Sequence, residues 1–436
     1  MSSRKRWIRA AAVVGAGSLL LAACGGGGKT TPGSTSNGSA TGNSTSTQPI
    51  TLRVAYWGEF GFQQLQAAYK AVAPNVTLKL ESGQYANVNG DLQKYLIANS
   101  GAPDVQAIDE GYIVQYRNEA QYFVNLNDMP GGAAHQSDYL PWKWKESLGP
   151  NGEQIGFGTD IGGQAMCYRT DLFKAAGFKT DRESVSKMWS TWADFETVGK
   201  QYVARTGKKF IDNATNILNP ILAQQSVGYF TSDEKLAMDG GPKAAWDATL
   251  PFVTDGLSAN IAANTPQWDA GFTSGAFAVL ACPAWMLGHI QEAAPTTSGK
   301  WDIAQIPGGG GNWGGSFLTI PKQSKHVDAA YAFIKWFTQP AQLLQVFKTV
   351  GNLPSEPVLY TDPSFTSFTK PFFSNAPTGV IFAKTAQNLQ PQYLGKLNGA
   401  VRTAVQNVMQ AVEDGHVKAA DSWTQAVAAA QKATEG

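Results

Sequence analysis

The sequence has few charged residues. Only 15% of its 436 residues are Asp, Glu, Lys or Arg, and the formal net charge is +1. Because four basic residues fall within the first nine positions, the rest of the chain has a net charge of −3. Nucleic-acid-binding proteins concentrate Lys and Arg on one face, and nothing in this composition indicates such a protein.

Two signatures of enzymes are also missing. The chain has no G-x-S-x-G segment, the turn that presents the nucleophile of many serine hydrolases. Its histidines lack the spacing of metal ligands; they are His135, His289, His326 and His416. We therefore expect no bound metal and no catalytic cofactor.

No apolar run is long enough to cross a bilayer comfortably. Residues 10–23 form an apolar run of only 14 residues after a basic start, whereas a membrane-spanning helix needs about 20. This is the pattern of a signal peptide. It ends in Leu21-Ala22-Ala23-Cys24-Gly25, which resembles the lipobox of bacterial lipoproteins.

The lipobox resemblance implies that residues 1–23 are a signal peptide. Cys24 would become the acylated first residue and hold the protein to the cell membrane on its extracytoplasmic face. Ordinary secretion, with cleavage after an Ala-x-Ala-like site, is the alternative. Residues 24–49 are mostly Gly, Ser, Thr and Asn and cannot bury a core, so they predict a flexible tether.

Cysteine is scarce, and only Cys167 and Cys282 follow Cys24. Both lie in apolar, strand-like runs, and an extracytoplasmic compartment permits disulfides. The two residues can form a bridge or serve as two small buried hydrophobic side chains. The sequence does not choose between these possibilities.

The most informative stretch is 269–285. Gly275 can end the preceding element, and residues 276–282 form a short apolar run typical of a buried strand. Pro283 cannot donate a backbone hydrogen bond, so the strand stops there and Trp285 follows at its carboxyl end. Open α/β sheets bind ligands at that edge, and an indole ring suits the C–H face of a sugar. The alternative is that Trp285 caps the core.

Strands and helices alternate along the chain, which predicts an α/β protein. Residues 50–57 have a strand pattern, 60–73 a helical pattern and 76–80 a second strand pattern, so a βαβ unit is expected at the start.

Further along, strand-like segments at 154–160 and 164–169 are joined by glycines, which indicates a crossover between two lobes. Asp171 is expected to cap the helix that follows, and Ser190 or Thr191 the next helix.

Taken in order, the segments resemble the family 1 extracellular solute-binding proteins, the sugar-capturing subunits of ABC importers. The motifs that carry the resemblance are Val54-Ala-Tyr-Trp-Gly58, Gly101-Ala-Pro-Asp104, Met166-Cys-Tyr-Arg-Thr-Asp-Leu-Phe173, Thr191-Trp-Ala-Asp-Phe195, Ile306-Pro-Gly-Gly309, Gly314-Gly-Ser316 and Ala329-Ala-Tyr-Ala-Phe-Ile334. The resemblance implies a two-lobe, type II periplasmic-binding-protein fold with a hinge and a ligand cleft between the lobes. It implies an N-terminal lobe of 50–158 with 308–362 and a C-terminal lobe of 159–307 with 363–436.

The resemblance also implies ligand-binding residues in the first half of the chain. Glu59 follows the first strand and would accept hydrogen bonds from sugar hydroxyls, with Trp57 as a wall of the cleft. Asp109 and Glu110 end a later strand and would occupy a second such position. The alternatives are that Trp57 belongs to the core and that Glu110 is a solvated helix cap.

Five more ligand-binding residues follow from the resemblance. Asp160 matches an acidic contact at the first crossover of the maltose-binding relative, and Trp285 matches its stacking tryptophan. Trp313, Gly314 and Gly315 lie at the return crossing, where glycine allows the backbone to approach a ligand closely. The alternative for Asp160 is a cap at the hinge.

The leading hypothesis is a lipoprotein without enzymatic activity that binds a di- or oligosaccharide and delivers it to ABC importer permease subunits. We expect a monomer, because no long heptad seam is present. One alternative is a surface glycoside hydrolase, which needs two facing carboxylates. Another is a glycan-binding adhesion lipoprotein, which differs only in its partners.

Overall fold

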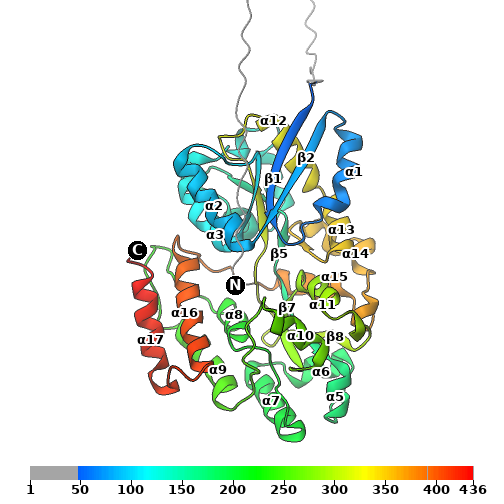
Figure 1. The fold of residues 1–436 in the computed structure, drawn as a ribbon, viewed down its shortest axis with the longest axis vertical. Coiled ribbons are helices and arrows are strands. Elements are labelled where there is room, and N and C mark those ends of the chain that lie inside the picture. Colours follow the sequence, from blue (N-terminus) through cyan, green and yellow to red (C-terminus); the bar gives the residue numbers. More distant parts are fainter. Residues whose placement is uncertain (1–47, 390, 436) are drawn as a thin grey trace, which may run out of the picture. The chain divides into compact units, whose positions relative to one another are not determined.

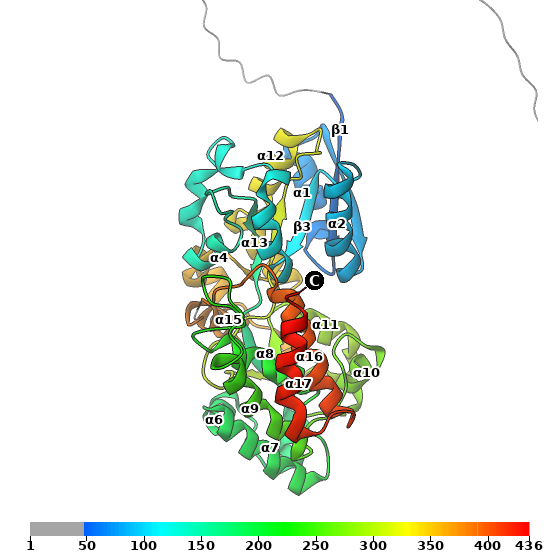
Figure 2. The ribbon, with the colours of Figure 1, turned by 90° about the vertical axis from the view of Figure 1, so that its left-hand side faces the viewer.

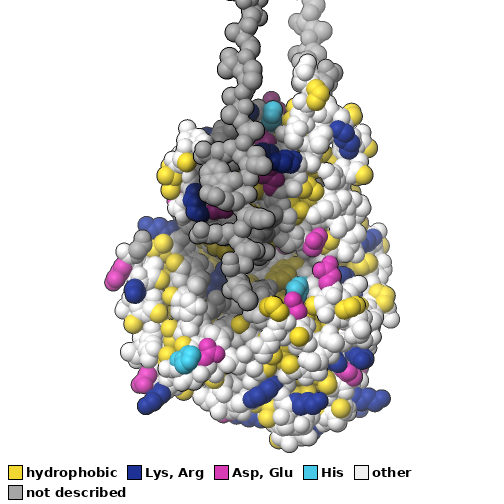
Figure 3. Space-filling model, viewed as in Figure 1, with side chains coloured by type: hydrophobic (Ala, Val, Ile, Leu, Met, Phe, Trp, Pro, Cys, Tyr) yellow, Lys and Arg dark blue, Asp and Glu magenta, His cyan; other side chains and the backbone are white. Residues whose placement is uncertain are grey.

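The computed structural model of the chain describes residues 48–389 and 391–435, which belong to one compact unit that begins at Gln48. The expected signal peptide (1–23), the expected acylation site at Cys24 and most of the expected tether (24–49) lie outside the described residues. On the face seen in Figure 3, acidic and basic side chains are interspersed, in keeping with the low net charge.

The first sheet has five strands in the order β2-β1-β3-β9-β4. They are β1 (Ile50–Trp57), β2 (Val76–Gly83), β3 (Val105–Asp109), β4 (Gly156–Gly158) and β9 (Ser316–Thr319). β1 pairs in parallel with β2 and β3, whereas β9 runs antiparallel to β3 and β4. Helix α1 (Phe62–Val72) connects β1 to β2, so the expected βαβ start is confirmed.

The second sheet has three strands in the order β7-β6-β8, and β6 is antiparallel to both neighbours. They are β6 (Gln164–Arg169), β7 (Val279–Pro283) and β8 (Trp301–Ala304). A small antiparallel pair joins β5 (Asp160–Ile161) to β10 (Leu353–Pro354). The second sheet is fully buried along all three strands.

The chain passes from the first sheet to the second between β4 and β6, and returns between β8 and β9. These two crossing segments touch at Gly162, which accepts a hydrogen bond from the backbone N–H of Trp313 (2.8 Å) and donates one to the carbonyl of Gly314 (3.1 Å). A Cβ atom on Gly162 would lie 1.9 Å from the Trp313 carbonyl oxygen. Only glycine fits at this contact.

Helices surround the sheets (Figures 1 and 2). Three helices lie in the sequence between β2 and β4: α2 (Tyr85–Ala98), α3 (Glu110–Tyr116) and α4 (Pro141–Glu146). Four follow β9: α12 (Val327–Phe337), α13 (Pro340–Thr349), α14 (Pro363–Thr366) and α15 (Thr378–Gln387). Those between β6 and β8 are α5 (Thr170–Ala175), α6 (Arg182–Met188), α7 (Trp192–Thr206), α8 (Thr215–Ala223), α9 (Gly241–Thr254), α10 (Pro266–Ser274) and α11 (Met286–Ala293). The last two, α16 (Asn398–Glu413) and α17 (Ala419–Lys432), lie side by side in both views.

Two local expectations about helix caps have different outcomes. Thr191 caps α7 in a capping box with Asp194, as expected. Asp171 does not cap α5: the helix begins one residue earlier, and the cap position is Arg169. The carboxylate of Asp171 instead receives two bonds from the Arg169 guanidinium (2.8 and 2.9 Å), and this ion pair was not visible in the cap pattern.

The strand expected at 276–282 starts later than predicted, at Val279. Gly275 does end the preceding helix in the left-handed conformation (φ 69°). Ala278 donates its backbone N–H to the carbonyl of Phe210 (3.0 Å), and its own carbonyl accepts the N–H of Arg169 in β6 (2.9 Å). Ala276 and Phe277 therefore connect the helix to the strand, and Ala278 adds one hydrogen bond to the pairing with β6.

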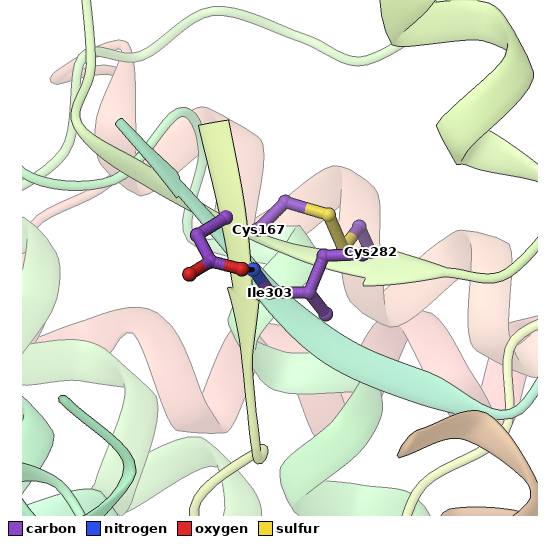
Figure 4. The surroundings of a disulfide bond; sticks show 4 residues. Cys167, Cys282 and Ile303 are labelled. Atoms are coloured by element: carbon purple, nitrogen blue, oxygen red, sulfur yellow. Dashed lines mark hydrogen bonds between the residues drawn. A yellow bond between two sulfur atoms is a disulfide. The ribbon is translucent and has the colours of Figure 1, made fainter. Parts of the chain in front are cut away.

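The structure joins Cys167 to Cys282 in a disulfide, which resolves the choice that the sequence left open. Figure 4 shows the bridge between β6 and β7, next to Ile303 of β8. Both cysteines are fully buried. The bridge lies three residues before Trp285, so it fixes the strand that leads to this residue.

Removing the bridge should lower the free energy of unfolding. The sequence separation of the two cysteines is 115 residues, and a closed loop of this length predicts a loss of roughly 4 to 5 kcal/mol from chain entropy. Chemical denaturation of the double variant C167A/C282A would measure the loss. Dithiothreitol should lower the midpoint of the wild type but not that of the variant; equal unfolding free energies would contradict a bridge.

Candidate functional site

Asp109 is placed by the junction of β3 and α3. It is the N-cap residue of α3, and its Oδ1 accepts the backbone N–H of Gly111 (2.8 Å) and the hydroxyl of Tyr85 (3.0 Å). Capping by a carboxylate is favourable because the first N–H groups of a helix have no partner within it. Only 8% of Asp109 is exposed. Burial raises the pKa of Asp109, and the charge of Arg402 opposes this shift.

Glu110 is buried rather than being a solvated cap. Its backbone N–H donates to the carbonyl of Gly315 (2.9 Å). Its carboxylate accepts from the backbone N–H of Gly314 (3.3 Å) and from the amide of Asn312. Burial raises the pKa of Glu110, and the neighbouring carboxylate of Glu146 adds to the shift. Glu110 therefore connects α3 to the return crossing.

Asp160 belongs to the first crossing and also binds the return crossing. Its Oδ1 accepts the hydroxyl of Thr159 (2.7 Å) and the backbone N–H of Ser316 (3.0 Å). Burial raises the pKa of Asp160, and the charge of Lys143 opposes it. Both bonds agree with the alternative that Asp160 acts at the hinge, and both use the same oxygen, Oδ1.

The two tryptophans meet where β7 and the return crossing come together. Trp285 precedes α11, and its indole N–H donates to the backbone carbonyl of Trp313 (3.1 Å). The ring centroids are 5.8 Å apart, with the planes at 73°. Both side chains are half-buried. Because the indole donor of Trp285 is already used, the part of this side chain left for a ligand is its apolar ring.

Glycines bring this segment close to the carboxylates. Gly314 and Gly315 have φ of 89° and 113°, in the region that favours glycine. A Cβ atom on Gly314 would lie 3.5 Å from Trp285 Nε1 and 3.9 Å from Asp109 Oδ2. The predicted residues 109, 110, 160, 285 and 313–315 are therefore neighbours.

Trp57 and Glu59 lie at the edge of this group. Trp57 is half-buried and contacts the ring of Tyr85 at 5.4 Å between centroids, so it is joined to Asp109 through Tyr85. Glu59 is exposed and stands apart from the buried carboxylates; its backbone carbonyl accepts the side chain of Asn352 (2.8 Å).

Lys143 is a central residue that the sequence did not reveal. It lies on α4, is 1% exposed, and places Nζ 3.7 Å from the ring centroid of Phe317 and 3.4 Å from Glu146. Its charge opposes the burial that raises the pKa of Asp109, Glu110 and Asp160. The one hint was its place between Trp142 and Trp144, an unusual setting for a surface lysine.

Arg402 of α16 is a second missed cation. Its Nη1 lies 3.9 Å from Glu110. The polar segment before α8 anchors α16 with several hydrogen bonds, among them Asn213 to Gln410 (2.9 Å) and the N–H of Ala214 to Glu413 (3.0 Å). These bonds fix the helix that carries Arg402.

Two other kinds of site, a metal centre and a separate cavity, are alternatives to this group. Within residues 48–389 and 391–435, no group of three or more His, Cys, Asp or Glu side chains is arranged to hold a metal ion. A cavity of about 390 Å³ lies elsewhere, against α1 and β2, and it is lined by residues such as Gln63, Lys70 and Thr77. It contains none of the buried carboxylates or tryptophans, so the side-chain group described above remains the candidate site.

Comparisons with known proteins place the chain in a family. Residues 64–374 match the sequence model of the bacterial extracellular solute-binding proteins. A crystal structure of an extracellular solute-binding protein of family 1 is 35% identical, covers 88% of this chain and 100% of its own, and superposes with a TM-score of 0.80. The chain therefore belongs to the bacterial extracellular solute-binding proteins, as its motifs predicted. Its fold is the type II periplasmic-binding-protein fold.

Two further similarities are to proteins with known ligands. The arabinooligosaccharide-binding protein of Bacillus subtilis is 25% identical over 276 residues, which is 57% of this chain and 59% of the relative's length. A binding protein from B. animalis subsp. lactis Bl-04, solved with beta-1,6-galactobiose, is 21% identical over 89% of this chain and 97% of its own, with a TM-score of 0.74.

The family is extracellular. Among the described residues, every helix is too short or too polar to cross a membrane.

Replacing Lys143 by Met should destabilise the protein, because it removes one of the two cations that balance the buried carboxylates. The expected loss at pH 8 is on the order of 3 kcal/mol. The variant raises the folded-state pKa of the acids further, so the loss is full above the folded pKa of the variant and disappears as the pH falls below the folded pKa of the wild type. Unfolding free energies at pH 5 and pH 8 measure this.

Lys145→Met is the matched control, because Lys145 is exposed on the same helix. Its unfolding free energy should differ little from that of the wild type at either pH. A loss for Lys143→Met that is the same at both pH values would contradict the charge-balancing role.

Proposed function

We propose that this protein captures a di- or oligosaccharide outside the cytoplasm and delivers it to the permease subunits of an ABC-type importer. The observation that carries the proposal is the meeting of two half-buried tryptophans with three buried carboxylates at the crossings between the two sheets. Carboxylates accept hydrogen bonds from sugar hydroxyls, and indole rings cover the apolar face of a pyranose or furanose. The two relatives with known ligands bind arabino-oligosaccharides and a galactobiose, which supports a saccharide.

The proposal includes the lobe boundaries. We propose an N-terminal lobe of 50–158 with 308–362 and a C-terminal lobe of 159–307 with 363–436. The five-stranded sheet lies within the first set of residues and the three-stranded sheet within the second, which supports the division, while the small pair β5–β10 joins the two sets. Closure about the crossings would enclose the ligand. Small-angle scattering should then give a smaller radius of gyration when ligand is added; no change would argue against closure.

Binding without hydrolysis is the better interpretation of the carboxylates. Asp109, Glu110 and Asp160 each accept a backbone N–H that fixes a helix end or a crossing. A glycoside hydrolase needs one acid free to transfer a proton and a second free to attack or to activate water. Shortened oligosaccharide after long incubation with the pure protein would favour the hydrolase instead.

Calorimetric titration of the chain from residue 48 onward should identify the ligand. The panel contains arabino-oligosaccharides, beta-1,6-galactobiose, cellobiose, xylobiose, maltose, trehalose, raffinose and monosaccharides. One-to-one binding of one compound or one series is expected. A folded protein that binds none of them would overturn the proposed function.

Trp285→Ala should weaken binding of the identified saccharide by roughly 30- to 900-fold, the effect of losing about 2 to 4 kcal/mol from a central aromatic contact. Trp285→Phe keeps an aromatic ring, so its affinity for the saccharide should fall by a smaller factor. Trp423→Ala is the matched control, because Trp423 is half-buried on α17 and packs on Trp246 away from the site. Unchanged affinity for Trp285→Ala would remove this residue from the site.

The proposal also includes a lipid anchor on Cys24 and a monomeric state. The anchor rests on the Leu-Ala-Ala-Cys sequence at 21–24. The full chain expressed in a bacterial host should partition into the detergent phase of a Triton X-114 extraction, and Cys24→Ser should partition into the aqueous phase. The same partitioning for both proteins would contradict acylation at this residue.

A further inference from the structure

We propose that Trp57, Tyr85 and Tyr112 form an aromatic platform that binds an additional sugar ring, so that the preferred ligand is longer than the segment held at Trp285 and Trp313. This inference rests on the proposed function and specifies the length of its ligand. Tyr85 and Tyr112 were not among the residues predicted from the sequence.

The platform is built where three successive elements meet at one edge of the first sheet. Trp57 is the last residue of β1, Tyr85 is the first residue of α2 after β2, and Tyr112 lies in the first turn of α3 after β3. Because β1 is parallel to both β2 and β3, the carboxyl ends of these strands share an edge. That is the edge at which α/β sheets bind ligands.

Tyr85 is open to solvent and yet held in a fixed orientation. It is 40% exposed. Its ring lies 5.4 Å from Trp57 and 5.8 Å from Tyr112 between centroids, with the planes at 81° and 68°. Its hydroxyl donates to Asp109 (3.0 Å). An aromatic side chain that is already fixed loses little conformational entropy when a ligand stacks on it.

The platform is continuous with the group around Trp285. Asp109 Oδ1 holds the hydroxyl of Tyr85, while Oδ2 lies 3.9 Å from the position that a Cβ of Gly314 would take. The same position is 3.5 Å from the indole nitrogen of Trp285. Asp109 therefore stands between the two aromatic groups, and a saccharide chain that stacks on both would pass this carboxylate.

Arg402 lies against the helix that carries Tyr112. A Cβ atom on Gly111 would lie 2.7 Å from Arg402 Nη2, and Nη1 lies 3.9 Å from Glu110. A cation close to the platform adds hydrogen-bond donors for a neutral, hydroxyl-rich ring.

The test measures affinity for saccharides of increasing length. Mono- to tetrasaccharides of the arabinan, xylan, cellulose and maltodextrin series are titrated into the wild type, Tyr85→Ala, Tyr85→Phe and Tyr122→Ala. Tyr122 is the matched control, because it is an exposed tyrosine (36%) in the segment after α3 that makes no contact with the platform residues.

Wild-type affinity should rise with length within the series that binds. For the longer members, Tyr85→Ala should lose roughly tenfold more affinity than Tyr85→Phe. The two variants should bind the shortest member equally well, because both lack the hydroxyl that bonds Asp109. Tyr85→Phe should keep most of the gain with length, because it retains the ring without the hydroxyl. Tyr122→Ala should match the wild type at every length.

Two results would overturn the inference. A loss for Tyr85→Ala that is equal at all lengths would mean that Tyr85 acts only by orienting Asp109, and no loss at any length would mean that the platform does not contact the ligand. In both cases the wild type still binds saccharide and the proposed function stands. A wild type that binds no saccharide of any length overturns the proposed function together with this inference.

Discussion

The candidate site depends on the close contact between the two segments that cross from one sheet to the other. The backbone of Gly162 lies against that of Trp313 at a separation that no side chain permits. This contact brings the return crossing alongside Asp160 and Glu110, whose carboxylates accept N–H groups from Ser316 and Gly314. Carboxylates and tryptophans that come from distant parts of the sequence are neighbours because the two crossings are neighbours.

Charge balance is the second constraint. Three carboxylates with raised pKa values lie in one buried group, and charged groups out of water are costly unless they are paired. The opposing charges come from Lys143 on α4 and Arg402 on α16, helices that are more than 250 residues apart. Each helix is therefore fixed both by its apolar packing and by a cation that the site requires.

A local strand pattern predicted only the place of Trp285, because the buried apolar run that ends at Pro283 shows where the strand stops. The family resemblance supplied the other candidate residues. The structure brings Asp109, Glu110, Asp160 and residues 313–315 together near Trp285 and leaves Glu59 exposed. No local strand pattern marks Lys143 or Arg402, since their roles depend on long-range packing. The disulfide was undecided for the same reason: pairing Cys167 with Cys282 requires the register of β6 and β7. The helix cap assigned to Asp171 was wrong because α5 begins at Thr170, which places Asp171 inside the first turn.

The long separation of α3 and α16 in the sequence affects when the site can form. A Cβ atom on Gly111 would lie 2.7 Å from Arg402 Nη2, so the end of β3 is completed by a helix that is synthesised more than 280 residues later. Until that helix has emerged, Asp109 and Glu110 lack one of their two counter-charges. Contacts of such long sequence separation form slowly, and a growing chain completes the candidate site only after α16 is available. A chain cut short before residue 402 would therefore lack both a finished fold and a finished site.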